Sequence, residues 1–421
     1  MNPAYLVICF SSASLLAATP IGISSAGGDS PDVPALRSFP TWETLQPSRE
    51  KWNYAPADKL LEVVKANGTE LTGIFHQLAP WASPDNAPEA FPLANPQAWN
   101  TYVTTLANRY PSVTRWDVLD SYNSGPRQSN TPFHYVELLT AAHDRSKEAN
   151  PAALIGFSLA NYDLEFLDEA LRSGAGGKFD YLSLSPFHYV AGTDRQFASI
   201  LPTVRALLAS YELPGEMPVH ITLTGGGKDL PHAAALAQAL GFDRIFIEAE
   251  PPLLKEIPAK APPLPEQVSY EGRDSAEIIF GETNDYKGIF QPVPATTPWD
   301  KENKAARLPV SASPPVFQTS FLVDPAFVSP DQKEIEITFH ISRIPSETGT
   351  TNPTGFALIY ESIHGLTTTP EWWAVPGENE WQTKTYKLTD ASFQGKLGWN
   401  FRIDASGAGN DLLIRKVVVK K

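Results

Sequence analysis

Between residues 35 and 250 the chain alternates short apolar runs with longer segments whose apolar positions have helical spacing. The runs predicted as strands are Leu71–His76, Val113–Leu119, Ala153–Ser158, Tyr181–Ser185, Val219–Leu223 and Arg244–Glu248. The segments predicted as helices are Ala57–Asn67, Pro96–Tyr110, Pro132–Asn150, Leu164–Ser173, Phe197–Tyr211 and Pro231–Leu240. Such alternation predicts a parallel sheet with crossover helices. Roughly 220 residues of it favour a closed (β/α)8 TIM-type barrel over an open sheet.

The start of this barrel allows two interpretations. Leu36–Trp42 can form a second strand and Ile21–Ser25 a first. The apolar run near the N-terminus also has the length of a signal-peptide core, and Ser24, Ser25 and Ala26 offer a small-residue cleavage site. Residues 1–26 are therefore predicted as a signal peptide and 27–250 as the barrel. Cleavage after Ala26 would remove the first strand, and the run could instead be a buried strand itself.

A proline-rich linker is predicted over residues 251–275, because its prolines interrupt any regular element. Beyond it, residues 276–421 show short alternating segments without helices. The clearest of these are Glu334–His340, Phe356–Tyr360, Thr383–Leu388, Leu397–Ile403 and Leu412–Val419. This pattern predicts an all-β sandwich or jelly roll, so the whole chain is expected to contain an α/β barrel followed by a β domain.

Composition excludes several classes of function. A formal net charge of −14 disfavours nucleic acid as a partner. Cys9 is the single cysteine, which rules out an intramolecular disulfide and a cysteine-based metal site. No histidine pair has helical metal-ligand spacing, so neither a metal nor a cofactor is expected. Apart from the leader no stretch is long enough to span a membrane, and a secreted or extracytoplasmic protein is predicted.

The barrel segment resembles the clan A glycoside hydrolases, most closely the family 39 type. The resemblance lies in the order of the matching pieces over about half the chain. These pieces are Trp42–Pro47 with Trp52, Tyr54 and Asp58; Leu78–Ala82; Trp99–Tyr110; and Tyr181–Tyr189. It implies a bacterial-type polysaccharide enzyme whose ligand is a polysaccharide or oligosaccharide.

The resemblance also implies that the catalytic carboxylates are missing. In the family the fourth strand typically ends Trp-Glu-Val-Trp-Asn-Glu-Pro, whereas Trp116–Tyr122 is WDVLDSY. Ser121 therefore takes the place of the acid/base, and Asp120 that of the asparagine. The seventh strand typically ends Thr-Glu-x-Gly, and here Leu223 stands at the nucleophile. Retaining hydrolysis needs two carboxyl groups about 5–5.5 Å apart, so a catalytically degenerate barrel, a pseudoenzyme, is expected.

The C-terminal segment has a resemblance of its own. Glu380–Phe393, Asn400–Ile403 and Asp411–Val418 are similar to the jelly-roll domains appended to bacterial polysaccharide enzymes. Those domains resemble carbohydrate-binding modules in fold. Sugar binding by this domain is therefore implied.

Side chains at the carboxyl ends of the strands are the candidate site. The predicted sugar-binding residues are His76, Trp81, Ser121, Tyr122, His188 and Tyr189. An alternative is an active glycosidase that uses displaced carboxylates, and its candidates are Asp120 with Glu248 or Glu250. Asp120 could instead be paired to an arginine, and Asp117 and Trp116 are expected to be structural. A third alternative is a structural surface protein. The sequence leaves the sugar and the oligomeric state open.

Overall fold

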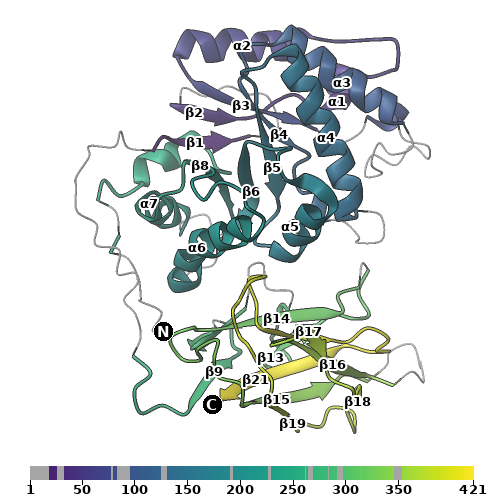
Figure 1. Cartoon of the computed structure of the whole chain (residues 1–421), viewed down its shortest axis with the longest axis vertical. Helices are drawn as coiled ribbons and strands as arrows, with labels where there is room; N and C mark the ends of the chain where they lie inside the picture. The colour runs from purple at the N-terminus through teal and green to yellow at the C-terminus, as the bar shows by residue number, and fades with distance from the viewer. Residues whose placement is uncertain are drawn as a thin grey trace.

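The computed structural model describes residues 19–25, 33–76, 79–82, 95–124, 130–189, 193–225, 229–260, 262–263, 269–282, 284–291, 297–313, 315–345 and 353–421. Two domains follow one another along the chain. The N-terminal domain is a barrel surrounded by helices, and the C-terminal domain is built of strands (Figure 1). No helix among the described residues is both long and apolar enough to cross a membrane.

Eight parallel strands close the barrel, which confirms the predicted fold class. They are β1 (Ile21–Ser24), β2 (Ala35–Arg37), β3 (Glu70–Phe75), β4 (Arg115–Val118), β5 (Leu154–Leu159), β6 (Tyr181–His188), β7 (Val219–Thr224) and β8 (Arg244–Ile247). Each strand pairs with the next, and β8 pairs with β1. The carboxyl ends of the strands therefore meet at one open end, called the mouth below, which is where side chains from different strands can act together.

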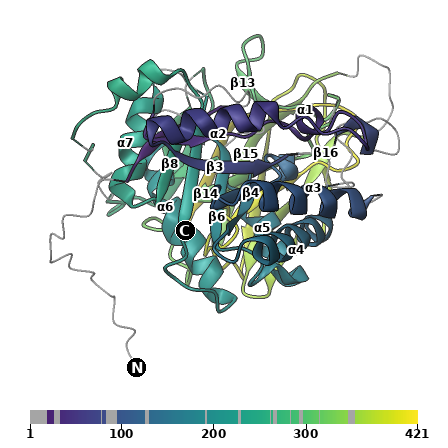
Figure 2. The same cartoon turned by 90° about the horizontal axis from the view of Figure 1, so that it is seen from above.

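Helices cover the outside of this barrel (Figure 2). They are α1 (Trp42–Leu45), α2 (Ala55–Asn67), α3 (Pro96–Arg109), α4 (Pro132–Ala149), α5 (Leu164–Ala170), α6 (Asp194–Ser210) and α7 (Leu230–Leu240). Local signals fix their ends. Asn95 and Thr131 cap α3 and α4 ahead of a first-turn proline, and Gly68 ends α2 with a φ of 67°.

The structure corrects the predicted start of the barrel. Ile21–Ser24 is a strand bonded on both sides, to β2 and to β8, so a domain that began at residue 27 could not close. Cleavage after Ala26 is therefore incompatible with this fold. The apolar run proposed as the leader lies outside the described residues. The presence of a leader stays a prediction.

The linker is shorter than the predicted 251–275. A 3-10 helix, η6 (Pro251–Glu256), follows β8, and Leu253, Leu254 and Ile257 pack against the barrel core. At the other end Tyr270 already belongs to the core of the second domain. The segment that joins the two domains is thus about residues 258–269.

Two antiparallel sheets form the second domain, as predicted. One contains β9 (Ser275–Ile279), β10 (Asp285–Lys287), β12 (Trp299–Asp300), β13 (Ala305–Leu308), β15 (Ile335–Arg343), β19 (Gln382–Leu388) and β21 (Leu412–Lys420). The other contains β11 (Ile289–Phe290), β14 (Gln318–Val323), β16 (Gly355–Ser362), β17 (Gly365–Thr368), β18 (Trp373–Ala374) and β20 (Phe401–Asp404). Phe321, Phe339 and Phe401 pack between the sheets in one apolar core.

The sandwich lies beside α5 and α6 of the barrel (Figure 1). Arg402 on β20 donates to Glu165 in the first turn of α5 at 2.7 Å. Arg195 in the first turn of α6 pairs with Asp324 after β14 at 2.6 Å. Because α5 and α6 begin where β5 and β6 end, the sandwich contacts the mouth side of the barrel.

Candidate functional site

A buried arginine organises the inside of the mouth. Arg37, the last residue of β2, is 1% exposed and lies between two aspartates. Its Nε donates to Asp117 Oδ2 at 2.7 Å, and its Nη2 donates to Asp120 Oδ1 at 3.0 Å. Burial lowers the pKa of Arg37, but the combined effect of the Asp120 and Asp117 charges is larger and raises it above its ordinary value. The guanidinium therefore stays charged and holds both carboxylates in place.

Asp117, on β4, is fully buried inside the barrel. Its carboxylate accepts three hydrogen bonds, from Arg37, from Tyr181 Oη at 2.7 Å and from Ser183 Oγ at 2.9 Å. The latter two donors are on β6. The position agrees with the structural role predicted for Asp117, because every hydrogen bond it accepts comes from the barrel interior.

Asp120 lies just beyond β4 and keeps about a quarter of its side chain exposed. It accepts from both terminal nitrogens of Arg37 and from Ser185 Oγ at 3.1 Å. Burial raises the pKa of Asp120, but the charge and hydrogen bonds of Arg37 outweigh burial, and the pKa is lowered overall. Asp120 is thus the arginine-paired carboxylate that the sequence left as one alternative. An anion of this kind is a poor proton donor near neutral pH.

The seventh strand presents no carboxylate to the mouth. His220 stacks on Tyr181 inside the barrel with ring centroids 4.1 Å apart. Since side chains alternate along a strand, Thr222 shares this inward side and Leu223 has the opposite one. The pairing agrees, because Leu223 is in register with Phe187, which contacts Phe197 of α6. Leu223 therefore packs under the helices, and Thr222, buried with no partner for its hydroxyl among the described residues, faces the interior.

His76 follows β3 and lies close to Asp120. Its Nε2 is 2.8 Å from the carbonyl of Phe39, which can only accept, so Nε2 carries the proton. Burial lowers the pKa of His76. A neutral imidazole in this tautomer leaves Nδ1 as an acceptor, which suits a ligand hydroxyl.

His188 is the exposed residue at the end of β6. Its backbone N–H donates to Asn161 Oδ1 at 3.1 Å, and its Nδ1 lies 2.9 Å from the same oxygen. An amide oxygen only accepts, so Nδ1 carries the proton and Nε2 is the acceptor. His188 therefore presents a fixed imidazole edge to solvent.

Two predicted binding residues are not available to a ligand. Tyr122 is 1% exposed, packs on Tyr135 and donates to the carbonyl of Thr131. Tyr189 is buried too, and its hydroxyl donates to Asp194. Burial raises the pKa of both phenols. The sequence placed them at strand ends correctly, but their side chains turn into the helix layer.

The remaining predicted residues differ in how exposed their side chains are. Ser121 is half-buried, with a φ of 61°, and Glu248 and Glu250 are exposed beyond β8. Trp81 is half-buried, and its Nε1 donates to the carbonyl of Gln46 at 2.5 Å, which holds the ring edge-on against Trp42. Of the three aromatic residues predicted to bind sugar, Trp81 is therefore the one whose ring stays partly exposed. Trp116 is fully buried, as expected of a core residue.

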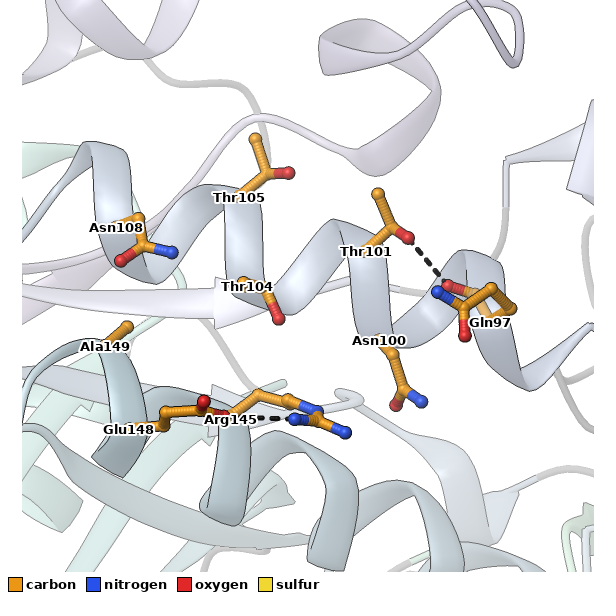
Figure 3. A pocket seen from close by; sticks show the side chains of 9 residues that line it. All are labelled: Gln97, Asn100, Thr101, Thr104, Thr105, Asn108, Arg145, Glu148 and Ala149. Atoms are coloured by element: carbon orange, nitrogen blue, oxygen red, sulfur yellow. Dashed lines mark hydrogen bonds and ion pairs between the residues drawn. The ribbon is translucent and has the colours of Figure 1, made fainter.

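Two of the cavities found among the described residues lie away from the mouth, and a small third one is at the ends of β5 and β6, lined by Tyr162 and Phe187. One, of about 620 Å³, lies between α3 and α4 and is lined by polar side chains such as Asn100, Thr104 and Arg145 (Figure 3). Another is near the amino ends of the strands and includes Glu70 and Arg115. Neither contains a predicted site residue. Within the described part of the chain, no three His, Cys, Asp or Glu side chains gather as metal ligands.

Arg37 is the central residue that the sequence analysis missed. A signal for it exists, because a charged residue inside a barrel strand must be paired or functional. Its partners could not be found from the sequence, since Asp117 and Asp120 are 80 and 83 residues away.

The family profile described as Glycosyl hydrolase family 10 matches residues 40–153. The match includes His76, Asp117 and Asp120 and ends before β7. Together with the closed barrel, it confirms the predicted clan A glycoside hydrolase fold.

Many solved structures are similar to this chain, and three of them illustrate the range. A family 39 glycoside hydrolase from Bacteroides cellulosilyticus WH2 is 11% identical with a TM-score of 0.45, over 92% of this chain and 81% of that one. A glucosidase from Croceicoccus marinus is 12% identical with a TM-score of 0.40, over 96% of both chains. The Thermobacillus composti GH10 xylanase is 14% identical with a TM-score of 0.38, over 58% of this chain and 90% of that one. At these values the similarity concerns the fold alone.

Proposed function

We propose that this chain binds a polysaccharide or oligosaccharide at the barrel mouth and does not hydrolyse it by the two-carboxylate mechanism. The observation that carries the proposal concerns β4 and β7, the strands at whose ends the family has its two catalytic carboxylates. β7 presents Thr222 inward and no acid, and the carboxylate next to β4, Asp120, is bound to Arg37. General acid–base help is worth about 10²–10⁴-fold, and the nucleophile would be missing as well.

The sugar-binding half of the proposal rests on the side chains left accessible. His76, Ser121 and His188 offer imidazole or hydroxyl groups at the mouth, and Trp81 offers a half-exposed ring. Neutral hydrogen-bonding groups beside an aromatic face suit a sugar, whose hydroxyls and apolar ring faces need both.

The alternative of an active enzyme has weaker support. Asp120 would have to act as an acid with a lowered pKa, or as a base while held by Arg37 and Ser185. Its proposed partners, Glu248 and Glu250, are exposed. Secretion is part of the proposal, supported by the leader-like run at the N-terminus and by the single cysteine.

The test is binding of the full-length protein to a panel of polysaccharides that includes xylan, with released reducing ends assayed in the same tubes. We expect binding without product. His188→Ala should weaken binding, and the matched control His364→Ala, an exposed histidine of the sandwich, should not. Product that disappears in Asp120→Asn would support the displaced-carboxylate enzyme. Absence of both binding and product would favour a structural surface protein.

A further inference from the structure

One short loop connects the mouth to the sandwich. Ala160–Asp163, called the bridging loop below, follows β5. Asn161 N–H donates to the carbonyl of Pro186 on β6 at 2.7 Å, and the Asn161 side chain holds His188. The loop is therefore attached to the end of β6, next to Ser185 and Asp120.

The same loop is attached to the end of β4. Asn123 Oδ1 accepts from the N–H of Ala160 at 2.8 Å, and Asn123 Nδ2 donates to the carbonyl of Ala160 and to Asp163, both at 3.1 Å. Asn123 lies two residues after Ser121. The bridging loop is thus hydrogen-bonded to the ends of both β4 and β6, the strands that place Asp120 and its partner Ser185.

On its other side the bridging loop contacts the sandwich. The ring of Tyr162 lies against Gly398, so close that a Cβ at position 398 would be 2.6 Å from Tyr162 Cε1. The next residue, Trp399, is buried with its ring 4.6 Å from the guanidinium carbon of Arg402, and Arg402 donates to Glu165. These residues belong to the turn before β20 and to β20 itself.

A second attachment lies at α6. Asp194 accepts from Tyr189, the residue after β6, and the neighbouring Arg195 pairs with Asp324. Asp324 is 4% exposed and also accepts from Tyr270 Oη at 2.9 Å. Two partly buried ion pairs and one close packing contact hold the sandwich against the β5–β6 side, which is more than a freely tethered module would show.

We propose that the sandwich is a fixed wall of the mouth, and that it ends the sugar site on the β5–β6 side. This inference rests on the proposed sugar binding. A chain whose sugar lies on Asp120 meets the bridging loop and the sandwich on that side and can extend only toward β1–β3. The ligand is then the end of a polysaccharide or a short oligosaccharide, and not the interior of a long chain.

Linear xylan and xylohexaose are the probes, with the variant Gly398→Ala. Its matched control is Gly407→Ala, because Gly407 has the same left-handed backbone, with φ 86° against 81°, and no neighbour within 4 Å. We expect xylohexaose and xylan to compete equally per mole of chain. Internal cuts that double the number of xylan ends should double the bound protein. Gly398→Ala, which displaces Tyr162, should raise binding to uncut xylan several-fold, and Gly407→Ala should not.

Binding that follows the mass of xylan regardless of its ends would overturn the chain-end inference and leave sugar binding intact. Absence of binding to both probes and to the rest of the panel would instead refute the proposed function. Hydrogen exchange then tests separately whether the sandwich holds the bridging loop in place. Faster exchange of the bridging-loop amides in Gly398→Ala but not in Gly407→Ala supports it, and unchanged exchange in both refutes it.

Discussion

Asp117 in the barrel and Glu361 in the sandwich are both buried carboxylates, and they are satisfied in different ways. Asp117 in the barrel is bound by the charged Arg37 and by two hydroxyls. Glu361, at the end of β16 in the sandwich, accepts from three backbone N–H groups, of residues 394–396, and from Asn400 Nδ2 at 2.8 Å. Burial raises the pKa of Glu361 despite these neutral donors.

The difference separates two uses of a buried charge. Glu361 shapes a loop of its own domain with neutral donors, so losing its charge leaves the donors with a polar partner. Asp117 shares its counter-ion with Asp120 at the mouth, so the barrel interior and the candidate site depend on the same guanidinium. A buried ion pair rarely adds much stability, but breaking it by removing one partner is costly.

The largest expected effect comes from a buried carboxylate with no donor. Leu223→Glu should cost about 5 kcal/mol or more in the free energy of unfolding, because Leu223 is fully buried beneath α6. It should not restore hydrolysis, because the side chain faces away from the mouth. Urea denaturation and a reducing-end assay measure both. A stable variant that releases product would show that Leu223 faces the mouth.

Removing the charged donor comes next. Arg37→Met should cost about 3–5 kcal/mol, because it leaves Asp117 buried without a counter-charge. The double variant Arg37→Met with Asp117→Asn should recover part of this loss. Equal losses in the single and double variants, measured by urea denaturation, would mean that packing of the long Arg37 side chain and not its charge is what matters.

Removing the carboxylate from its neutral donors should cost less. Glu361→Ala leaves four N–H groups without their acceptor, and we expect a loss of about 1–3 kcal/mol. Glu361→Gln keeps one acceptor oxygen and should lose less still. Thermal unfolding of the two variants measures this. A loss for Glu361→Gln as large as for Glu361→Ala would show that the charge itself holds the loop.

The smallest effect is the pH dependence, and its sign differs between the domains. The pKa of Asp120 is lowered from 3.8, so its stabilisation is present above that value and is lost as the pH falls through the lower folded pKa. The pKa of Glu361 is raised from 4.5, so its contribution is full below that value and is lost as the pH rises through the higher folded pKa.

Unfolding free energies from about pH 3 to about pH 7 test this difference. The stability of the parent relative to Asp120→Asn should grow with pH, and relative to Glu361→Gln it should shrink. The same sign for both pairs would contradict the opposite directions of the pKa shifts of Asp120 and Glu361.

Most of the fold was predictable because it depends on local periodicity. The prediction of one strand over Leu36–Trp42 was wrong. β2 ends at Arg37, and Trp42 begins α1, because Pro40 has no N–H for a strand ladder and Thr41 caps the helix by accepting from Thr44 N–H. Pro40 and Thr41 are both visible in the sequence, but the apolar pattern alone does not show the break that they make.

The site was less predictable because it depends on side-chain direction and on distant partners. Strand-end positions were found for Tyr122 and Tyr189, but nothing local shows that their rings turn into the helix layer. Alignment placed Leu223 at the nucleophile, whereas its direction follows from pairing with β6. The pairing of Arg37 with Asp117 and Asp120 joins segments that only the closed barrel brings together.

β1 is four residues long and supplies both edges that close the barrel. A processing enzyme that cut after residue 24 would leave β2 and β8 with exposed backbone N–H and C=O groups, and open edges of this kind promote association between chains. The position of one proteolytic cut would therefore separate a monodisperse barrel from an aggregation-prone sheet. An expression plasmid for this protein should accordingly retain every residue from Thr19 onward.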